Sequence, residues 1–145
     1  MKARIGVAII IPCYNYGRFL GDAIESALAQ TVQPAEILVV DDGSTDNTAA
    51  VASQYEPLLR YVYQENAGPS SARNYGIRIT QSQWLLFLDA DDILDPQAIQ
   101  ELSECAQLPE QPDLVFGDAS TFEGQTVTCE RYVAKRTFTS AWLSS

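Results

Sequence analysis

One stretch of the chain reads Trp84-Leu85-Leu86-Phe87-Leu88-Asp89-Ala90-Asp91-Asp92. Five apolar residues end abruptly on three carboxylates within four positions, which is typical of a strand buried on both faces of a sheet. The acids come at the carboxyl end of this strand, where open α/β sheets bind their ligands. Three carboxylates so close together repel one another, so a positive group should lie among them. A divalent cation is the simplest choice, because hard cations prefer carboxylate oxygens.

The rest of the chain alternates between strand and helix patterns. Apolar, β-branched runs predict strands at 5–11, 37–40, 58–63, 84–88 and 113–117, and an indistinct strand-like segment at 121–139. Apolar residues at helical spacing predict helices at 17–30, 46–54 and 70–80, and a fourth that starts at 95–96. Pro12 is expected to end the first strand, Asp46 to cap the second helix, and Ser70 or Ser71 to cap the third.

This alternation predicts an α/β fold with a mostly parallel central sheet and helices on both faces. The third strand is less apolar than the others and is expected at an edge. The 145 residues are one domain's worth of chain, and no internal repeat, low-complexity linker or domain boundary interrupts them. The sequence therefore predicts a single domain spanning residues 1–145.

Composition narrows the possible partners. The net charge of −10, without histidine, disfavours nucleic acid and anionic membranes, which need clustered Lys and Arg. No apolar stretch is long enough to span a bilayer. Cys13, Cys105 and Cys129 form no CxxC pair and no metal-ligand spacing, so we expect free thiols in a reducing cytoplasm.

Acids end two of the buried strands and suggest a nucleotide site. A Mg²⁺ or Mn²⁺ ion at Asp89–Asp92 would bridge carboxylates to phosphate oxygens and act as a Lewis acid on a leaving diphosphate. The alternative is a solvated acidic turn that caps the next helix. One aspartate of the Asp41-Asp42 pair could accept a hydrogen bond from a ring N–H of a nucleobase, and Gly43 would let the backbone turn close to a ligand. The alternative there is an ordinary Asp-Gly turn.

Two further residues fit the same site. Tyr14 follows the first strand and could stack on a base, although an aromatic at a strand end is more often packing. Arg73 lies just inside a helix N-terminus, where the helix dipole disfavours a cation unless an anion is near. A nucleotide phosphate or the acids around Asp89 would satisfy it; the alternative is a surface pair with a Glu.

Four stretches together resemble the inverting GT-A glycosyltransferases of family 2. They occur in the family's order and at similar spacing: Ile10-Ile11-Pro12-Cys13-Tyr14-Asn15, Val39-Val40-Asp41-Asp42-Gly43-Ser44-Thr45-Asp46, Asn66-Ala67-Gly68-Pro69-Ser70-Ser71-Ala72-Arg73-Asn74 and Phe87-Leu88-Asp89-Ala90-Asp91-Asp92. The resemblance covers roughly residues 4 to 118. It implies a Rossmann-like GT-A fold and a transfer, with inversion, of a sugar from a nucleotide-diphosphate sugar to an acceptor hydroxyl.

The resemblance also implies roles for single residues. Pro12 and Tyr14 would line the base, Asp42 would bind its ring, typically uracil, and Arg73 would sit near the base or the phosphates. Asp89-Ala90-Asp91 would be the DxD signature, in which Asp91 is the expected ligand of Mn²⁺ or Mg²⁺. Asp89 would lie closer to the ribose while sharing the metal. Asp92 would contact the metal or the sugar.

The family's acceptor-binding half, which supplies the general base, has no counterpart in these residues. Asp118, Glu123 and Glu130 are the acids after Gly117, and none lies in an acidic motif ahead of a helix. The resemblance therefore implies the N-terminal, nucleotide-sugar-binding part of a longer enzyme, or a naturally short member, in the cytoplasm or at the inner face of a membrane through parts absent here. The acceptor could be a carbohydrate, a lipid or a protein.

Three alternatives stay open from the sequence. The chain could be a non-catalytic sugar-nucleotide-binding module. It could be a phosphotransfer enzyme of the haloacid-dehalogenase type, although such enzymes carry their DxD near the start of the chain. It could be a nucleotidyltransferase, although no Gly-rich, Lys-bearing loop follows the first strand.

Overall fold

A computed structural model of the chain describes residues 6–107, 109, 115, 121–123 and 126–128. Its contacts group the chain into two units, residues 1–99 and 100–145, and each unit is described by itself. Among the described residues, no helix is both long enough and apolar enough to cross a bilayer.

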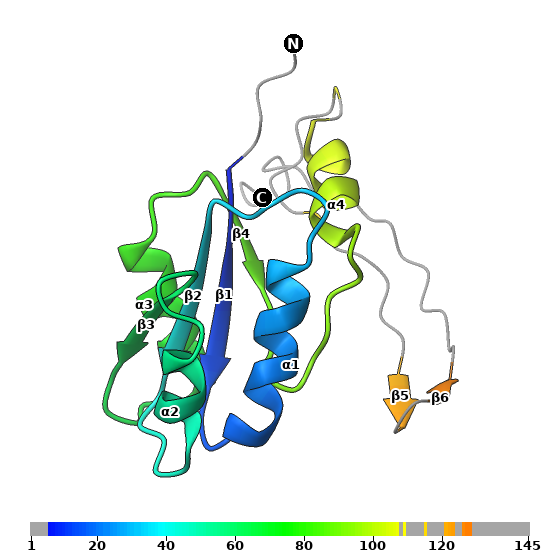
Figure 1. The fold of residues 1–145 in the computed structure, drawn as a ribbon. Helices are drawn as coiled ribbons and strands as arrows, with labels where there is room; N and C mark the ends of the chain where they lie inside the picture. The colour runs from blue at the N-terminus through cyan, green and yellow to red at the C-terminus, as the bar shows by residue number, and fades with distance from the viewer. Residues whose placement is uncertain (1–5, 108, 110–114, 116–120, 124–125, 129–145) are drawn as a thin grey trace, which may run out of the picture. The chain divides into compact units, whose positions relative to one another are not determined.

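The first unit is built on a four-stranded parallel sheet. Its strands are β1 (Val7–Cys13), β2 (Glu36–Asp41), β3 (Arg60–Tyr63) and β4 (Trp84–Phe87). They lie side by side in the order β3-β2-β1-β4, and every pairing is parallel (Figure 1). The parallel α/β fold is therefore confirmed, with β3 at an edge as the sequence predicts.

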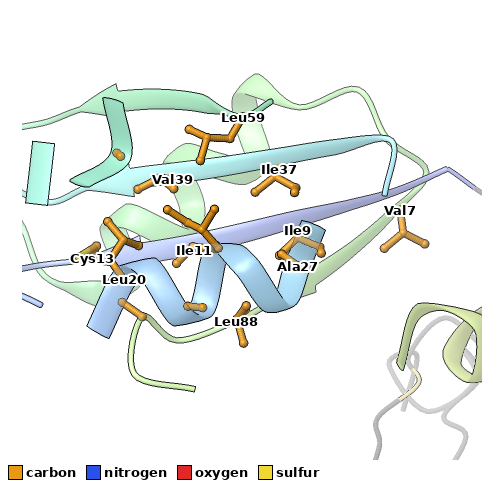
Figure 2. Close-up of a cluster of buried hydrophobic side chains, with 14 of the residues drawn as sticks. Val7, Ile9, Ile11, Cys13, Leu20, Ala27, Ile37, Val39, Leu59 and Leu88 are labelled. Atoms are coloured by element: carbon orange, nitrogen blue, oxygen red, sulfur yellow. The ribbon is translucent and has the colours of Figure 1, made fainter. Parts of the chain in front are cut away.

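Helices cover both faces of this sheet, as predicted. Successive side chains of a strand point to opposite faces, and β1 follows this rule with apolar residues throughout. Ile9 and Ile11 face a cluster that includes α1 (Gly17–Leu28) and α2 (Thr48–Ser53), as Figure 2 shows for several of its members. Ile10 faces the other way, toward Ala72 of α3 (Pro69–Ile79). β1 is thus buried on both faces, and the polar residues of the sheet lie at the ends of its strands.

The remaining elements are short. Helix α4 (Ala98–Ala106) begins in the first unit, where Ile99 is buried, and continues into the second. The second unit also contains an antiparallel hairpin of β5 (Thr121–Glu123) and β6 (Thr126–Thr128) within the predicted strand-like segment 121–139. The predicted strand at 113–117 falls outside the described residues except for Val115, which lies in no helix or strand.

Pro12 does not end β1, which was the expectation, but lies inside it. On the β4 side, the carbonyls of residues 6 and 10 accept from the N–H groups of residues 84 and 88. On the β2 side, those of residues 7 and 13 accept from residues 35 and 42, so by this alternation the backbone N of Pro12 is on the β4 side. The pairing with β4 stops at Ile10, whereas the pairing with β2 continues to Cys13. The missing N–H of Pro12 therefore costs no ladder hydrogen bond, which is why a proline is tolerated there.

Other boundaries also differ from those predicted. Helix α3 starts at Pro69 with Gly68 as its N-cap, so neither serine caps it; proline suits the first helical position. Helix α2 starts at Thr48 with Asn47 as its N-cap, one residue later than expected, and α4 starts at Ala98, two residues later than expected. Full burial of the Trp84–Leu88 run is wrong: Trp84, Leu85 and Leu86 are half-buried, Phe87 is 43% exposed and only Leu88 is buried, because β4 is an edge strand of the described sheet.

Candidate functional site

A pocket of about 540 Å³ opens at the carboxyl ends of β1, β2 and β4. Seven of the eight site residues predicted from the sequence line it: Pro12, Tyr14, Asp42, Arg73, Asp89, Ala90 and Asp91. Asp92, the eighth, is not among the lining residues. The pocket also includes residues that the sequence analysis did not single out, namely Cys13, Tyr16, Asn66, Gly68, Pro69 and Ala72. The three converging strand ends therefore form one site.

Hydrogen bonds tie the loop after β1 to the loop after β2. The backbone N–H of Asn15 donates to Ser44 Oγ at 2.9 Å, and Asn15 Oδ1 accepts from the N–H of Thr45 at 2.8 Å. Asn15 has a φ of 56°, a left-handed conformation that asparagine tolerates better than most residues. The conformation of the Tyr14–Tyr16 segment is therefore set by the neighbouring loop.

Asp46 joins two helix N-termini instead of capping one. Its Oδ2 accepts from the N–H of Gly17 at 2.9 Å, at the start of α1, and its Oδ1 accepts from the N–H and hydroxyl of Thr48 at the start of α2. Partial burial alone would raise the pKa of Asp46, but the hydrogen bonds from Thr48 and Gly17 outweigh it and lower that pKa. A side chain at Gly17 would collide with Asn47 and Thr48, so glycine allows this approach.

Asp42 is the anchor of the loop that precedes α3. Its Oδ1 accepts from Gln64 Nε2 at 2.5 Å and from the N–H of Ala67 at 3.0 Å. Its Oδ2 accepts from the N–H of Gly68 at 2.8 Å and, more weakly, from Asn66 Nδ2 at 3.4 Å. A carboxylate offers about four acceptor positions, and Asp42 is only 2% exposed. All four positions are thus engaged within the protein, and the Asn66 contact is the weakest of them.

The turn at Gly43 serves the same loop. Gly43 has a φ of 81°, and a Cβ at this position would meet the backbone N of Asn66 at 2.8 Å. The close approach expected of this glycine is therefore made, in the described structure, to the protein's own backbone. Asp41 next to it is 1% exposed, and its carboxylate accepts from the N–H of Ser44 at 2.7 Å and from the Tyr61 hydroxyl at 2.6 Å.

The acids after β4 have a different environment. Asp89 Oδ1 pairs with Arg73 Nη2 at 2.6 Å, although the two side chains are 52% and 34% exposed. Of the two anions expected to satisfy Arg73, a nucleotide phosphate or the acids around Asp89, the structure shows the second. Asp91 and Asp92 are exposed. Partial burial first, and then the charges of Asp91 and Asp89, raise the pKa of Asp92, so the expected repulsion is present.

The walls of the pocket combine aromatic rings, which suit a flat ligand, with a net negative charge, which an anionic ligand could meet only with a cation beside it. Among its described lining residues, three carboxylates and one guanidinium carry charge, and Arg73 is the single cation. Tyr14 is 47% and Tyr16 42% exposed, which leaves their rings available for stacking. Two exposed aromatic residues spaced two apart after a buried strand are a signal that could have identified Tyr16 from the sequence.

The pocket carboxylates could hold a divalent cation only if a bound substrate supplied further oxygen ligands. No group of three or more Cys, Asp or Glu residues in the described part of the chain is arranged to hold a metal ion. Asp89 and Asp91 nevertheless both face the pocket and offer hard oxygen donors. Mg²⁺ commonly takes one or two carboxylates and completes its shell with substrate phosphates and water. The residues present fit such a shared site.

Comparison with known proteins agrees with this geometry. An uncharacterized glycosyltransferase of Rickettsia conorii is 43% identical over 114 residues, covering 77% of this chain and 19% of its own length. Glycosyltransferase GlyG of Streptococcus pneumoniae is 31% identical, covering 91% of this chain and 45% of its own. The structure of S. aureus TarS residues 1–349 in complex with UDP has a TM-score of 0.65 at 25% identity, covering 70% of this chain and 32% of that one.

The family model described as glycosyl transferase family 2 matches residues 8–136. This match excludes the phosphotransfer and nucleotidyltransferase alternatives, which belong to other families. The chain spans less than half the length of these relatives. The family match, together with the fold and the composition of the pocket, shows that the chain belongs to glycosyl transferase family 2.

Proposed function

We propose that this chain binds the donor of a glycosyltransferase that moves a sugar, with inversion, from a nucleotide-diphosphate sugar to an acceptor hydroxyl. The single observation that carries the proposal is the pocket in which Arg73, Asp89 and Asp91 meet two exposed tyrosines at the end of a parallel sheet. UDP is the nucleotide we favour, since TarS, of the same fold and 25% identical, is described in complex with UDP.

Each wall of the pocket has a proposed task. Tyr14, beside Pro12, stacks on the base, as aromatic rings do with nucleobases. Asp42 fixes the loop around the base and accepts a hydrogen bond from the ring N–H of the base. This bond replaces the long contact from Asn66, which is the weakest that Asp42 makes. Arg73 turns from Asp89 to the diphosphate, because a guanidinium binds phosphate oxygens well. Ala90 lines the pocket between the two carboxylates, and Asp92, which does not line it, reaches the metal or the sugar from beside it.

Asp91, with Asp89, would hold a Mn²⁺ or Mg²⁺ ion. When bound, such an ion neutralises charge that develops on the departing diphosphate. Without it, a diphosphate would face the three pocket carboxylates with one guanidinium to offset them, so the donor is expected to bind weakly. We assign no general base to the chain, because the carboxylates that line the pocket all have tasks on the donor side.

A non-catalytic module that only binds sugar nucleotides is the second candidate. It is favoured by the same lack of an assignable base in the described residues. The free thiols of Cys13 and Cys105 fit a reducing compartment, so for either candidate we place the protein in the cytoplasm. Cys129, also expected to be a free thiol, lies outside the described residues. The acceptor stays open between a carbohydrate, a lipid and a protein.

Thermal unfolding with UDP, GDP, dTDP or CDP, each with Mn²⁺ and with EDTA, tests the donor site. A ligand at 100 times its dissociation constant adds about 2.7 kcal/mol to the free energy of unfolding. For a chain of this size, the midpoint should rise by roughly 2–4 °C, or somewhat more, for each kcal/mol. A shift with UDP that needs Mn²⁺ is expected. No shift with any nucleotide would contradict the proposal.

Asp91→Ala sharpens this test. The variant should lose the Mn²⁺-dependent shift and still unfold cooperatively, because Asp91 is exposed. Asp22→Ala removes the same charge from an exposed position of α1 that does not line the pocket, and it should behave like the wild type. Undiminished Mn²⁺-dependent binding by Asp91→Ala would refute the assignment of the metal to this residue.

A further inference from the structure

Gln30 is a polar side chain buried in the core just after α1. It is 2% exposed, yet it is far from any lining residue in the sequence. Its Nε2 donates to the carbonyl of Asp95 at 2.7 Å and to that of Ser26 at 3.2 Å. Its Oε1 accepts from the N–H of Ile99 at 3.0 Å. Gln30 therefore uses three of the four hydrogen bonds that an amide can make, two of them with the segment that follows the acidic loop.

Two neighbours of Gln30 hold the same segment. Ser26 Oγ donates to the carbonyl of Ala23 at 2.8 Å and accepts from the N–H of Leu94 at 3.1 Å. The N–H of Thr31 donates to the carbonyl of Pro96 at 2.8 Å. Apart from the bonds to the carbonyls of Ala23 and Ser26, which lie within α1, these bonds end on backbone atoms of residues 94–99. The end of α1 thus fixes the path of this backbone.

The acidic loop Asp89–Asp92 lies between two fixed points. On one side the N–H of Leu88 donates to the carbonyl of Ile10 at 3.0 Å, and Leu88 is 3% exposed. On the other side is the clamp on Leu94 from Ser26. Within the loop, the N–H of Asp92 donates to the carbonyl of Asp89 at 3.0 Å and closes a tight turn. Ala90 is buried and Asp89 pairs with Arg73, but the carboxylate of Asp91 is exposed, so its position depends strongly on the end of the loop that follows it.

We infer that Gln30, with Ser26, is a positioning residue for the metal-binding carboxylate of Asp91. This inference rests on the proposed function and deepens it. Gln30 touches neither donor nor metal; it determines where the loop that carries Asp91 is held against the pocket. A displacement of a ligand by as little as an ångström impairs a metal site built from one or two carboxylates, because the remaining ligands come from the diphosphate and cannot follow.

The variants Gln30→Ala and Ser26→Ala test the inference in the full 145-residue chain. The matched control is Gln33→Ala, since Gln33 also makes two amide hydrogen bonds, but to the carbonyls of Leu28 and Gln30 and not to residues 94–99. For each protein we would measure the dissociation constant of UDP by calorimetry, once with Mn²⁺ and once with EDTA, together with the free energy of unfolding.

The ratio of the two dissociation constants is the decisive quantity. Gln30→Ala should reduce the gain in UDP affinity from Mn²⁺ about tenfold, while affinity in EDTA changes less than twofold. Ser26→Ala removes the one side-chain contact of Ser26 with residues 94–99, at a helix position that alanine suits, so it should fold and reduce the gain about threefold. Gln33→Ala should leave the gain unchanged.

Two outcomes would overturn the inference. A retained Mn²⁺ gain in Ser26→Ala and in folded Gln30→Ala would show that the clamp does not position Asp91. Equal losses of affinity with Mn²⁺ and with EDTA would assign Gln30 a purely structural role. If the wild type shows no Mn²⁺-dependent UDP binding, the proposed function itself fails. If the wild type shows it and the variants keep it, the proposed function stands and only the inference about Gln30 fails.

Discussion

Two strands of this sheet end on acids, and the two ends differ in almost every physical respect. Asp41 and Asp42 after β2 are 1% and 2% exposed, whereas Asp89 after β4 has a side chain that is 52% exposed. The first pair accepts hydrogen bonds from the N–H groups of Ser44, Ala67 and Gly68. The acids after β4 have Arg73 and otherwise repel one another. The same sequence pattern therefore produces two kinds of site.

The difference indicates separate roles for the acids after β2 and the acids after β4. Buried carboxylates that accept several backbone hydrogen bonds hold loops in place, because each bond satisfies a donor that would otherwise be stranded. Exposed carboxylates that lie close together, as where Asp91 and Asp89 raise the pKa of Asp92, are stabilised by a nearby cation. The β2 end builds the pocket, and the β4 end leaves part of it ready for a ligand. Substitutions at the two ends should separate stability from binding.

The largest effect on stability is expected from Asp42→Ala. It leaves the N–H groups of Ala67 and Gly68 and the amide of Gln64 without their acceptor, and unsatisfied donors cost about 1–3 kcal/mol each when buried. Because this loop is partly open to water, we expect a loss of about 2–4 kcal/mol in the free energy of unfolding, measured with urea.

Asp91→Ala supplies the opposite arm of the comparison. Its free energy of unfolding should stay within about 0.5 kcal/mol of the wild type, as for most surface substitutions. A loss at Asp91 as large as that at Asp42 would mean that both ends are structural, and the contrast between them would fail.

Tyr61→Phe is expected to have a smaller effect at the β2 end. It removes the hydroxyl that donates to Asp41 at 2.6 Å. Burial first, and then the hydrogen bond to Asp41 and its charge, raise the pKa of Tyr61, so the tyrosine stays a neutral donor. Hydrogen bonds to a charged group contribute roughly 1.5–3 kcal/mol, and we expect a loss near the lower figure.

Tyr63→Phe is the control for this loss. Tyr63 lies on the same strand and is 58% exposed, so the same substitution there should change the unfolding free energy little. Similar losses for the two variants would show that Asp41 does not depend on the Tyr61 hydroxyl.

The smallest expected effect is the pH dependence of stability that Asp46 contributes. Asp46 is exposed, like the acids after β4, but accepts backbone hydrogen bonds, like the acids after β2. Its pKa is lowered by folding, so its contribution is present above the ordinary value of about 3.9 and is lost as pH falls through the lower folded value. Asp46→Asn should therefore be less stable than the wild type at pH 6, with the gap closing below about pH 4.

Urea denaturation across pH 2.5–7 would measure this gap. Thr48→Val removes one donor to Asp46, so in that background the stability gap should close over a narrower range of pH. A gap that stays constant from pH 7 to pH 2.5 would mean that the charge of Asp46 has no part in joining the two helices.

The outline of the fold follows from the sequence because it depends on local pattern. Apolar runs gave the four strands of the sheet, and the stripe from Leu20 to Ala27 gave α1. Acids at the ends of two parallel strands were bound to meet at one edge, so the candidate pocket also followed. The boundaries that were missed, such as Pro12 inside β1, depend on which neighbour each residue pairs with, and this is a property of the whole sheet.

The hydrogen-bonded supports of the site could not be predicted in the same way. Asp42 finds its donors more than twenty residues away, in a loop whose path no local pattern dictates. Gln30 finds Ile99 across 69 positions. One signal was present: Gln30 follows Ala27 by three positions and so continues the apolar stripe of α1. A lone polar residue on such a stripe indicates a buried partner without naming it.

Pro12 also has a consequence for what can assemble at this edge of the sheet. Beyond Ile10, β1 runs on past the end of its pairing with β4, and a free strand edge ordinarily invites another strand to add to it. Here the first position that would have to donate is an imide nitrogen that carries no hydrogen. No strand, from this chain or from another, can zip onto β1 at that point. The same proline lines the pocket, so this stretch of strand edge faces the pocket without a donor that could pair with a further strand.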